Sequence, residues 1–136
     1  MQWEDDGYCF VCGALNSHGL RIGFRETEKG VTAAFSADKR FQGYKEIVHG
    51  GILATLLDEA SVKALLARGI KAVTAEMVLR FKHPLLVGQH AVVDASIVGN
   101  RGRVYSVQAE IRGEGGHIIA FSRAKLVTEE KSREKV

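Results

Sequence analysis

The stretch VHGGILATLLDEA, residues 48–60, decides how the rest of this chain folds. Two glycines precede a run of apolar residues, which ends at two adjacent acids, Asp58 and Glu59. This pattern predicts one long helix over residues 50–67, and Gly69 has the position of a C-terminal cap. Because apolar residues occupy almost every side of this helix, we expect the rest of the chain to surround it.

Alternating apolar and polar residues predict strands on both sides of the helix. Short connections separate the later segments, which is typical of an antiparallel meander. One long helix with five or six antiparallel strands predicts an α+β fold, a single domain in which a curled sheet wraps around the helix. Within residues 72–81, one face is expected to carry Val73, Ala75, Met77, Leu79 and Phe81. The expected strands cover residues 20–27, 30–37, 72–81, 90–99, 103–112 and 117–127.

The length and composition of the chain are those of one globular domain. Its 136 residues are 46% hydrophobic and 26% charged, which excludes a disordered chain. Residues 1–19 are expected to be an irregular flap, and the charged residues 128–136 a frayed tail. No apolar run approaches the roughly 20 residues that a membrane-spanning helix needs, so no membrane partner is expected. The acidic start, MQWEDDGYCF, has the pattern of neither a secretory signal nor a transit peptide, so the expected compartment is the cytoplasm.

The charge pattern argues against a nucleic-acid-binding protein. The formal net charge of +3 is mild, the cationic residues are dispersed, and aromatic residues make up only 7% of the chain. Such a chain suits an anionic small molecule as its ligand.

The two cysteines of the chain lie in the motif CFVCG, residues 9–13. A Cys-x-x-Cys pair can bind zinc or carry out redox chemistry. Structural zinc needs four ligands, however, and beyond His18 no further ligand lies nearby in the sequence. A thioredoxin-type role needs the motif at the start of a helix, whereas its context here is a loop. We therefore predict turn formation and packing for Cys9 and Cys12, and no metal site.

Asp58 is the main candidate for a catalytic group. It lies in the middle of the expected helix, where it cannot cap the free N–H groups of the first turn. Its neighbours Leu56 and Leu57 are core-like, so the carboxylate is partly removed from water, which increases its strength as a base. The structural alternative is an ion pair near a subunit contact. Glu59, about 100° around the helix, is expected to form a salt bridge or to support the site indirectly.

His49, Gly50 and Gly51 stand at the start of the helix. The glycines either shape the helix start or leave its N–H groups open to a carbonyl oxygen, as an oxyanion hole. His49 is either a general base or a helix-entry residue whose ring bonds to the backbone. We favour a positioning role for His49.

Four segments together resemble the hotdog-fold acyl-CoA thioesterases, namely HGGILATLLDEA, TAEMVLRFKHPLLVG, GRVYSVQAEI and GHIIAFSRAKLV. Within that superfamily they resemble the phenylacetyl-CoA-thioesterase-like branch, which includes the mammalian thioesterase-superfamily members. The resemblance covers residues 20–127 and implies hydrolysis of an acyl-CoA thioester to a free acid and coenzyme A. It implies no metal or redox cofactor, and similar proteins carry the motif of residues 9–13 in a folded flap without metal.

The resemblance also implies roles for single residues. The Gly50 amide, with Gly51 behind it, would polarise the thioester carbonyl, and Asp58 of another subunit would activate water or attack directly. Gln42 would orient the water or the carbonyl. Thr74 would steady the water, unless it is simply a β-branched residue that favours a strand. We therefore expect at least a homodimer, and a dimer of dimers as the larger assembly.

Cationic residues are the candidates for binding the phosphates of coenzyme A. Each of them alone is equally well explained as a solvated strand residue. The turn NRGR is favoured, because similar proteins place a Gly-Arg pair there and because a planar guanidinium matches a phosphate. The candidates are Arg80, Lys82, Arg101, Gly102 and Arg103, with Lys125 as a further cation.

Two other classes of function compete with the hydrolase. A non-catalytic acyl-CoA-binding or sensing protein would keep the pocket and the cationic residues but would not need Asp58. A hotdog dehydratase would rely on differently placed histidine and acid pairs, which the sequence lacks. The presence of Asp58 at the family position favours the enzyme.

Overall fold

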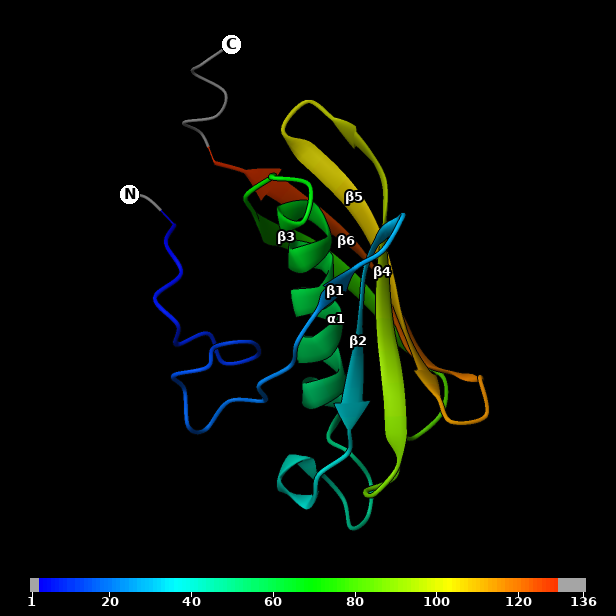
Figure 1. Ribbon diagram of the computed structural model, residues 1–136. Helices are drawn as coiled ribbons and strands as arrows, with labels where there is room; N and C mark the ends of the chain where they lie inside the picture. The colour runs from blue at the N-terminus through cyan, green and yellow to red at the C-terminus, as the bar shows by residue number, and fades with distance from the viewer. Residues whose placement is uncertain (1–2, 130–136) are drawn as a thin grey trace.

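A long helix, α1 (Gly50–Leu66), runs through the centre of the computed structural model, which describes residues 3–129 (Figure 1). His49 caps its start, because Nδ1 of the imidazole ring accepts the Gly51 N–H at 2.8 Å. The helix predicted over residues 50–67 is therefore confirmed, with residue 67 as its C-cap.

The C-terminal end of α1 is closed by two backbone hydrogen bonds. The Gly69 N–H donates to Leu66 O at 2.9 Å, and the Ile70 N–H donates to Leu65 O at 3.0 Å. Gly69 has a φ of 76°, the left-handed conformation that this arrangement, the Schellman motif, requires. The cap predicted at Gly69 is confirmed.

Within residues 3–129, six strands form one antiparallel sheet that curls around α1 (Figure 1). Their order is β1-β2-β4-β5-β6-β3, so the strand that follows the helix in sequence forms one edge. The predicted α+β fold, a curled sheet around one long helix, is confirmed. A short 3-10 turn, η1 (Lys39–Phe41), precedes α1. The strands are β1 (Arg25–Glu26), β2 (Gly30–Ser36), β3 (Ala72–Phe81), β4 (His90–Arg101), β5 (Val104–Gly113) and β6 (Ile118–Thr128).

The core lies between α1 and the concave face of the sheet. Apolar side chains of the helix that have no exposed surface are Leu56, Leu57, Ala60, Ala64 and Leu65. They share one cluster with strand residues such as Val93, Ile111 and Leu126. Burial of each such large side chain stabilises the fold by roughly 1.5–3 kcal/mol. The wrapping of the sheet around the helix is therefore a main source of stability.

The strand predicted over residues 20–27 is wrong for most of its length, because only two of its residues form β1. The backbone before β1 makes its hydrogen bonds outside the sheet. The N–H group of Leu20 donates to the carbonyl oxygen of Phe10, and that of Ile22 to the carbonyl oxygen of Val11, both at 2.8 Å. The side chains of Leu20 and Ile22 are buried. These residues therefore fasten the start of the chain to the domain instead of lengthening the sheet.

A β-bulge in β3 changes the predicted alternation of that strand. The register of β3 against β6 shifts between Thr74 and Glu76, so Ala75 is an extra residue without a partner. Thr74 pairs with Leu126, whose side chain lies in the core, so Thr74 faces the helix. The prediction that Val73 and Ala75 share one face with Met77 and Leu79 is wrong, since both are exposed and the extra residue breaks the two-residue period.

The two ends of the chain were expected to be irregular. Residues 3–19 form turns without a helix or a strand. The tail expected over residues 128–136 begins at the last residue of β6, and residues 130–136 lie outside the described part of the chain. Among the helices of residues 3–129, none has the length and hydropathy needed to span a membrane.

Gly69→Ala is expected to lower the free energy of unfolding by about 1 kcal/mol, because an L side chain is strained at a positive φ. The space around Gly69 is open, so the loss measures backbone strain rather than a clash. Denaturant titration gives the value. Gly23→Ala is the matched control, because its surroundings are equally open and its φ is not positive. Equal losses in the two variants would contradict the assignment.

Candidate active site

Asp58 and Thr74 form a short hydrogen bond between α1 and the edge strand. Thr74 Oγ1 donates to Asp58 Oδ1 at 2.5 Å, and both residues are half-buried. A distance this short is typical of a hydroxyl that donates to a carboxylate. The contact depends on the bulge, because without the extra residue Thr74 would point away from the helix. The structure thus brings two of the predicted site residues together.

The start of α1 presents one amide that is free to bind a ligand. The Gly51 N–H is occupied by the His49 ring, whereas Gly50 N–H has no acceptor anywhere in residues 3–129. Because Nδ1 accepts this bond, a neutral His49 carries its proton on Nε2. Gly50 is exposed, with the Phe81 ring 3.7 Å from the position that a Cβ would take. Gly50 rather than Gly51 is therefore the amide open to a carbonyl oxygen, while His49 holds the helix start.

Gly50 and Asp58 do not meet within one chain. Their eight-residue separation corresponds to about 12 Å along a helix. A carbonyl that accepts one N–H and is attacked at its carbon needs both groups within about 3 Å of the reacting atoms. Gly50 lies beside Phe81, the last residue of β3, whereas Asp58 bonds to Thr74 near its start. The two halves of the predicted site therefore stand near opposite ends of the same edge strand.

Gln42 helps to shape the loop before α1. Its side-chain Oε1 accepts the Glu46 N–H at 2.8 Å, and Glu46 has a positive φ of 68°. In the same loop Gly43 packs closely on His49, where an added Cβ would stand 3.2 Å from the His49 Cα. The side-chain carbonyl of Gln42 is thus engaged by its own loop, and its part in orienting water or substrate stays a prediction.

The predicted phosphate-binding residues separate into two groups. Arg80 and Lys82 lie at the end of β3 and, with Arg123, line a hollow of about 270 Å³. Arg101 is the last residue of β4, and Gly102 follows it in the β4–β5 turn, at the other end of the sheet (Figure 1).

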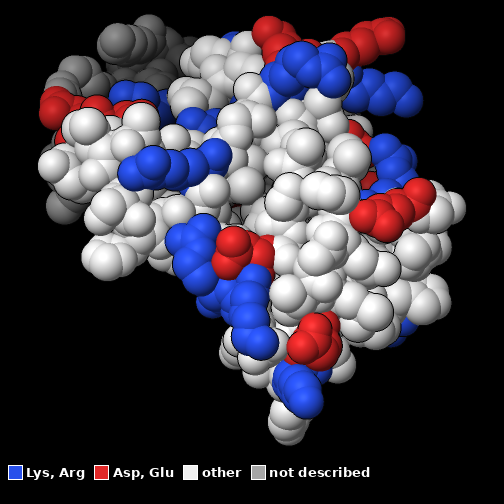
Figure 2. All heavy atoms as spheres, turned by 60° about the horizontal axis from the view of Figure 1, so that its bottom comes forward, with Lys and Arg blue, Asp and Glu red and all other residues white. Residues whose placement is uncertain are grey.

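Two other cationic candidates have partners within the domain. Arg103 donates to Thr128 O at 2.8 Å, and Lys125 pairs with Glu76 at 3.9 Å. On the face seen in Figure 2, basic side chains are scattered among uncharged ones and beside acids, so they form no continuous basic band. The structure does not bring all the cationic candidates to one place within a single chain.

Sequence reasoning missed a second polar cluster on α1. Glu59 forms the expected ion pair, with 4.0 Å between its Oε2 and Lys63 Nζ, and Cys9 Sγ donates to the same Oε2 at 3.5 Å. Burial, with a further contribution from Glu59, raises the pKa of the Cys12 thiol to about 12, so this thiol is neutral at physiological pH. Fifty residues separate Cys9 from Glu59, so no local pattern in the sequence could reveal the contact.

The chain belongs to the thioesterase superfamily. The family description "Thioesterase superfamily" matches residues 45–120, which contain α1 and much of the sheet. The resemblance stated from the sequence motifs is confirmed at this level.

Two proteins of similar sequence extend this finding. Mouse acyl-coenzyme A thioesterase THEM5 is 30% identical over 97 residues, which cover 71% of this chain and 35% of THEM5. The uncharacterized mitochondrial membrane protein FMP10 of Saccharomyces cerevisiae is 26% identical over 116 residues, which cover 79% of this chain and 48% of FMP10. The chain thus spans less than half the length of either relative.

Three solved structures share the fold. The thioesterase superfamily protein RHA08564 has a TM-score of 0.84 at 21% identity, over 89% of this chain and 63% of that one. Escherichia coli PaaI has a TM-score of 0.74 at 21% identity, over 79% and 83% of the two chains. Streptococcus mutans smu.793, solved bound to acetyl CoA, has a TM-score of 0.74 at 19% identity, over 79% and 88%. At these identities the likeness shows the hotdog fold.

Thr74→Val is expected to lower the free energy of unfolding by about 1–2 kcal/mol, because it leaves a half-buried carboxylate without its donor. Thr74→Ser keeps the hydroxyl and should lose less. Thr32→Val on β2 is a control for replacing a strand threonine by valine. Denaturant titration at one protein concentration compares the three variants. If Thr74→Val were no more destabilised than Thr32→Val, the hydrogen bond would have no role in stability.

Proposed function

We propose that the chain is an acyl-CoA thioester hydrolase, which releases a free carboxylic acid and coenzyme A at a site shared by two subunits. The observation that carries the proposal is the half-buried Asp58 carboxylate in the middle of α1, held by the Thr74 hydroxyl at 2.5 Å. In a chain of the thioesterase superfamily, such a carboxylate can supply the base or the nucleophile that thioester hydrolysis needs. The names of two similar proteins support the coenzyme: THEM5 is called an acyl-coenzyme A thioesterase, and smu.793 was solved with acetyl CoA.

Asp58 acts at the carbonyl carbon of the thioester. Its carboxylate either takes a proton from the attacking water or attacks the carbon itself, and water then hydrolyses the resulting anhydride. Both routes break the carbon–sulfur bond and release coenzyme A as a thiol. Thr74 occupies Oδ1 of the carboxylate, which fixes its orientation and leaves Oδ2 for the water or the carbonyl carbon.

Gly50 acts at the carbonyl oxygen. Negative charge develops on this oxygen as the carbon is attacked, and the free N–H at the start of α1 stabilises it together with the helix dipole. Removal of one such donor typically costs about 10²–10³ in kcat.

The edge strand β3 gives two chains a way to complete the site. In the described part of the chain β3 pairs on one side only, with β6, and it has ten residues. Its side chains Val73, Val78 and Phe81 are 45%, 57% and 54% exposed. Because a long apolar edge that is left unpaired invites another strand, pairing with β3 of a second copy is the expected way to cover it.

Antiparallel pairing of two β3 strands about a two-fold axis places the end of one strand beside the start of the other. Gly50 lies next to Phe81 at the end of β3, and Asp58 is bonded to Thr74 near its start. This pairing would therefore carry the Gly50 amide of one chain toward Asp58 of the second. The active unit of the proposal is a homodimer, and a dimer of dimers is the larger assembly that we expect.

Incubation with a panel of aromatic, short-chain and long-chain acyl-CoAs should release free thiol. Asp58→Asn should lower kcat for the best substrate by about 10²–10⁴, because it removes the base or nucleophile while its amide oxygen can still accept the Thr74 hydroxyl. Thiol detection measures the rate, and size-exclusion chromatography checks that assembly is unchanged. A near-normal rate in Asp58→Asn would exclude this mechanism. If acyl-CoAs raised the melting temperature without turnover, the protein would be a binder or sensor.

Mixed dimers test whether the site is shared. Gly50→Pro removes the amide donor at the first helical position, where proline is tolerated, and the extended His49 before it (ψ 133°) suits a proline. Gly50→Pro and Asp58→Asn should each be slow on their own. A 1:1 mixture of these two variants should regain about a quarter of normal activity after subunit exchange, because half of the dimers then contain one intact site of two.

The mixture carries its own controls. Neither variant should gain activity when taken through the same exchange alone, and Gly50→Ala, which keeps the N–H, should lose less rate than Gly50→Pro. Failure of the mixture to recover activity, with exchange verified by mass spectrometry, would show that both groups act within one chain.

A further inference from the structure

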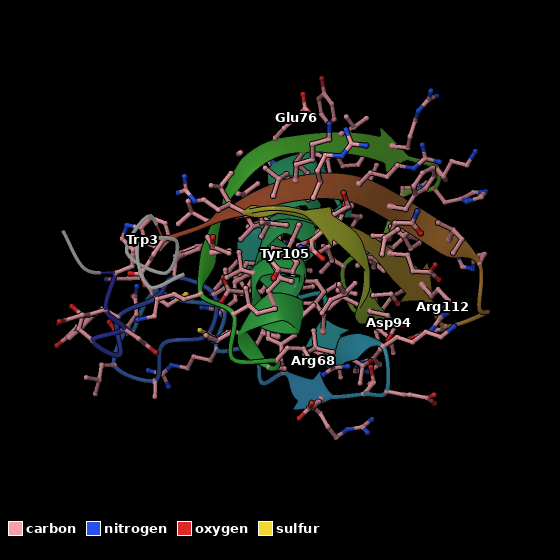
Figure 3. The ribbon with its side chains drawn as sticks, turned by 90° about the horizontal axis from the view of Figure 1, so that it is seen from above. Trp3, Arg68, Glu76, Asp94, Tyr105 and Arg112 are labelled. Atoms are coloured by element: carbon pink, nitrogen blue, oxygen red, sulfur yellow. The ribbon has the colours of Figure 1, made fainter. Side chains whose placement is uncertain are left out.

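The start of the chain, residues 3–24, lies beside α1 (Figures 1 and 3). Both of its cysteines lie close to Glu59 of that helix. Ligand atoms of Cys9, Cys12 and Glu59 lie within 4.8 Å of one another, and all three residues are half-buried. The proposed hydrolysis uses none of them. His18, the third ligand considered from the sequence, is exposed and is not part of this group of described residues.

The backbone of the cysteine motif is already shaped for a thiolate pair. The Cys12 N–H donates to Cys9 Sγ at 3.5 Å, and the Gly13 N–H donates to Cys9 O at 2.8 Å. Position 13 accepts only glycine, since a Cβ there would stand 2.4 Å from Cys9 N. This tight turn brings the two sulfurs together and directs a backbone N–H at one of them, a contact that stabilises a metal-bound sulfur.

The distance between Cys9 Sγ and Glu59 Oε2 fits a tetrahedral cation, and the other ligand pairs lie within 4.8 Å. The 3.5 Å between Cys9 Sγ and Glu59 Oε2 equals the edge of about 3.5 Å expected for Zn–S and Zn–O bonds of about 2.3 and 2.0 Å. Glu59 stands on α1, so its carboxylate is held by a rigid element on the far side of the turn. Two sulfurs and one carboxylate select a thiophilic divalent ion rather than magnesium or calcium.

The charges of the cluster also balance around a divalent ion. A bound cation deprotonates coordinating thiols, so two thiolates and one carboxylate together carry three negative charges. Lys63, whose Nζ lies 4.0 Å from Glu59 Oε2, supplies one positive charge, and a divalent ion supplies the other two. The acids Glu4, Asp5, Asp6 and Glu59 line the same hollow of about 520 Å³ and outnumber its lysines, Lys63 and Lys71, which favours the entry of a cation.

We propose that Cys9, Cys12 and Glu59 form a binding site for a zinc ion, with water as the fourth ligand. This replaces the prediction of no metal site, which was made from the sequence without Glu59 as a ligand. The ion ties residues 3–24 to α1 at the residue next to Asp58. It is not a participant in the hydrolysis, so the site can be tested without any activity measurement.

The test uses the full chain without a histidine tag, reduced and freed of metal, and titrated with Co²⁺ as a spectroscopic stand-in for Zn²⁺. We expect one Co²⁺ per chain, with the near-ultraviolet absorption of a cobalt–thiolate bond, and displacement of that absorption by Zn²⁺. The chain has just two cysteines, so this absorption can come from no other site. Saturating Zn²⁺ should also raise the melting temperature.

Isosteric variants identify the ligands. Cys12→Ser should abolish the cobalt–thiolate absorption of the intact site, and Glu59→Gln should weaken Zn²⁺ binding by about tenfold or more. Glu28→Gln is the control, because it replaces an exposed carboxylate that is not part of the ligand group, and this variant should bind Zn²⁺ as the unmodified protein does. Circular dichroism verifies that each variant is folded.

Three outcomes would overturn the proposal. The first is the absence of cobalt–thiolate absorption in protein whose two thiols are shown to be free by thiol titration. The second is equal Zn²⁺ affinity in Glu59→Gln and Glu28→Gln. The third is a rise in melting temperature that persists in Cys12→Ser, which would place the cation elsewhere.

Discussion

The burial of one face of α1 against the sheet is the constraint from which the rest of the structure follows. Leu56, Leu57 and Ala60 have no exposed surface and lie on this one face. The apolar residues on the other sides are less covered, since Leu66 is 44% exposed, so the expectation that the chain surrounds the helix on almost every side is wrong. The sheet curls over this face, and the 17-residue helix, about 25 Å long, sets the length of the strands that pack on it. The sheet of residues 3–129 curls without closing, and β3 is left as an open edge.

The bulge in β3 reconciles two demands that a regular strand cannot meet. Met77 packs on the core, and Thr74, three residues earlier, must face the same side to reach Asp58. Side chains an odd number of residues apart point to opposite faces of a strand. The extra residue, Ala75, restores the match, so a local defect in pairing creates the polar contact on which the proposed hydrolysis rests.

The helix serves as scaffold and as carrier of reactive groups. Its start offers the Gly50 amide, its middle holds Asp58, and Glu59 projects about 100° away toward the start of the chain. The two adjacent acids therefore have different neighbours: Asp58 bonds to a threonine of the edge strand, and Glu59 lies beside two thiols. In the proposed dimer the same edge strand joins the subunits and brings the two catalytic half-sites together.

The sequence alone determined the helix, the four strands after it and the family, because periodicity and motifs are local properties. It also singled out Asp58, since an acid among leucines is visible without a structure. Only the tertiary structure decided that Thr74 faces Asp58, that His49 leaves Gly50 as the free amide, and that Cys9 meets Glu59. These contacts join residues on different elements, and strand register and chain packing set them, which no local pattern encodes.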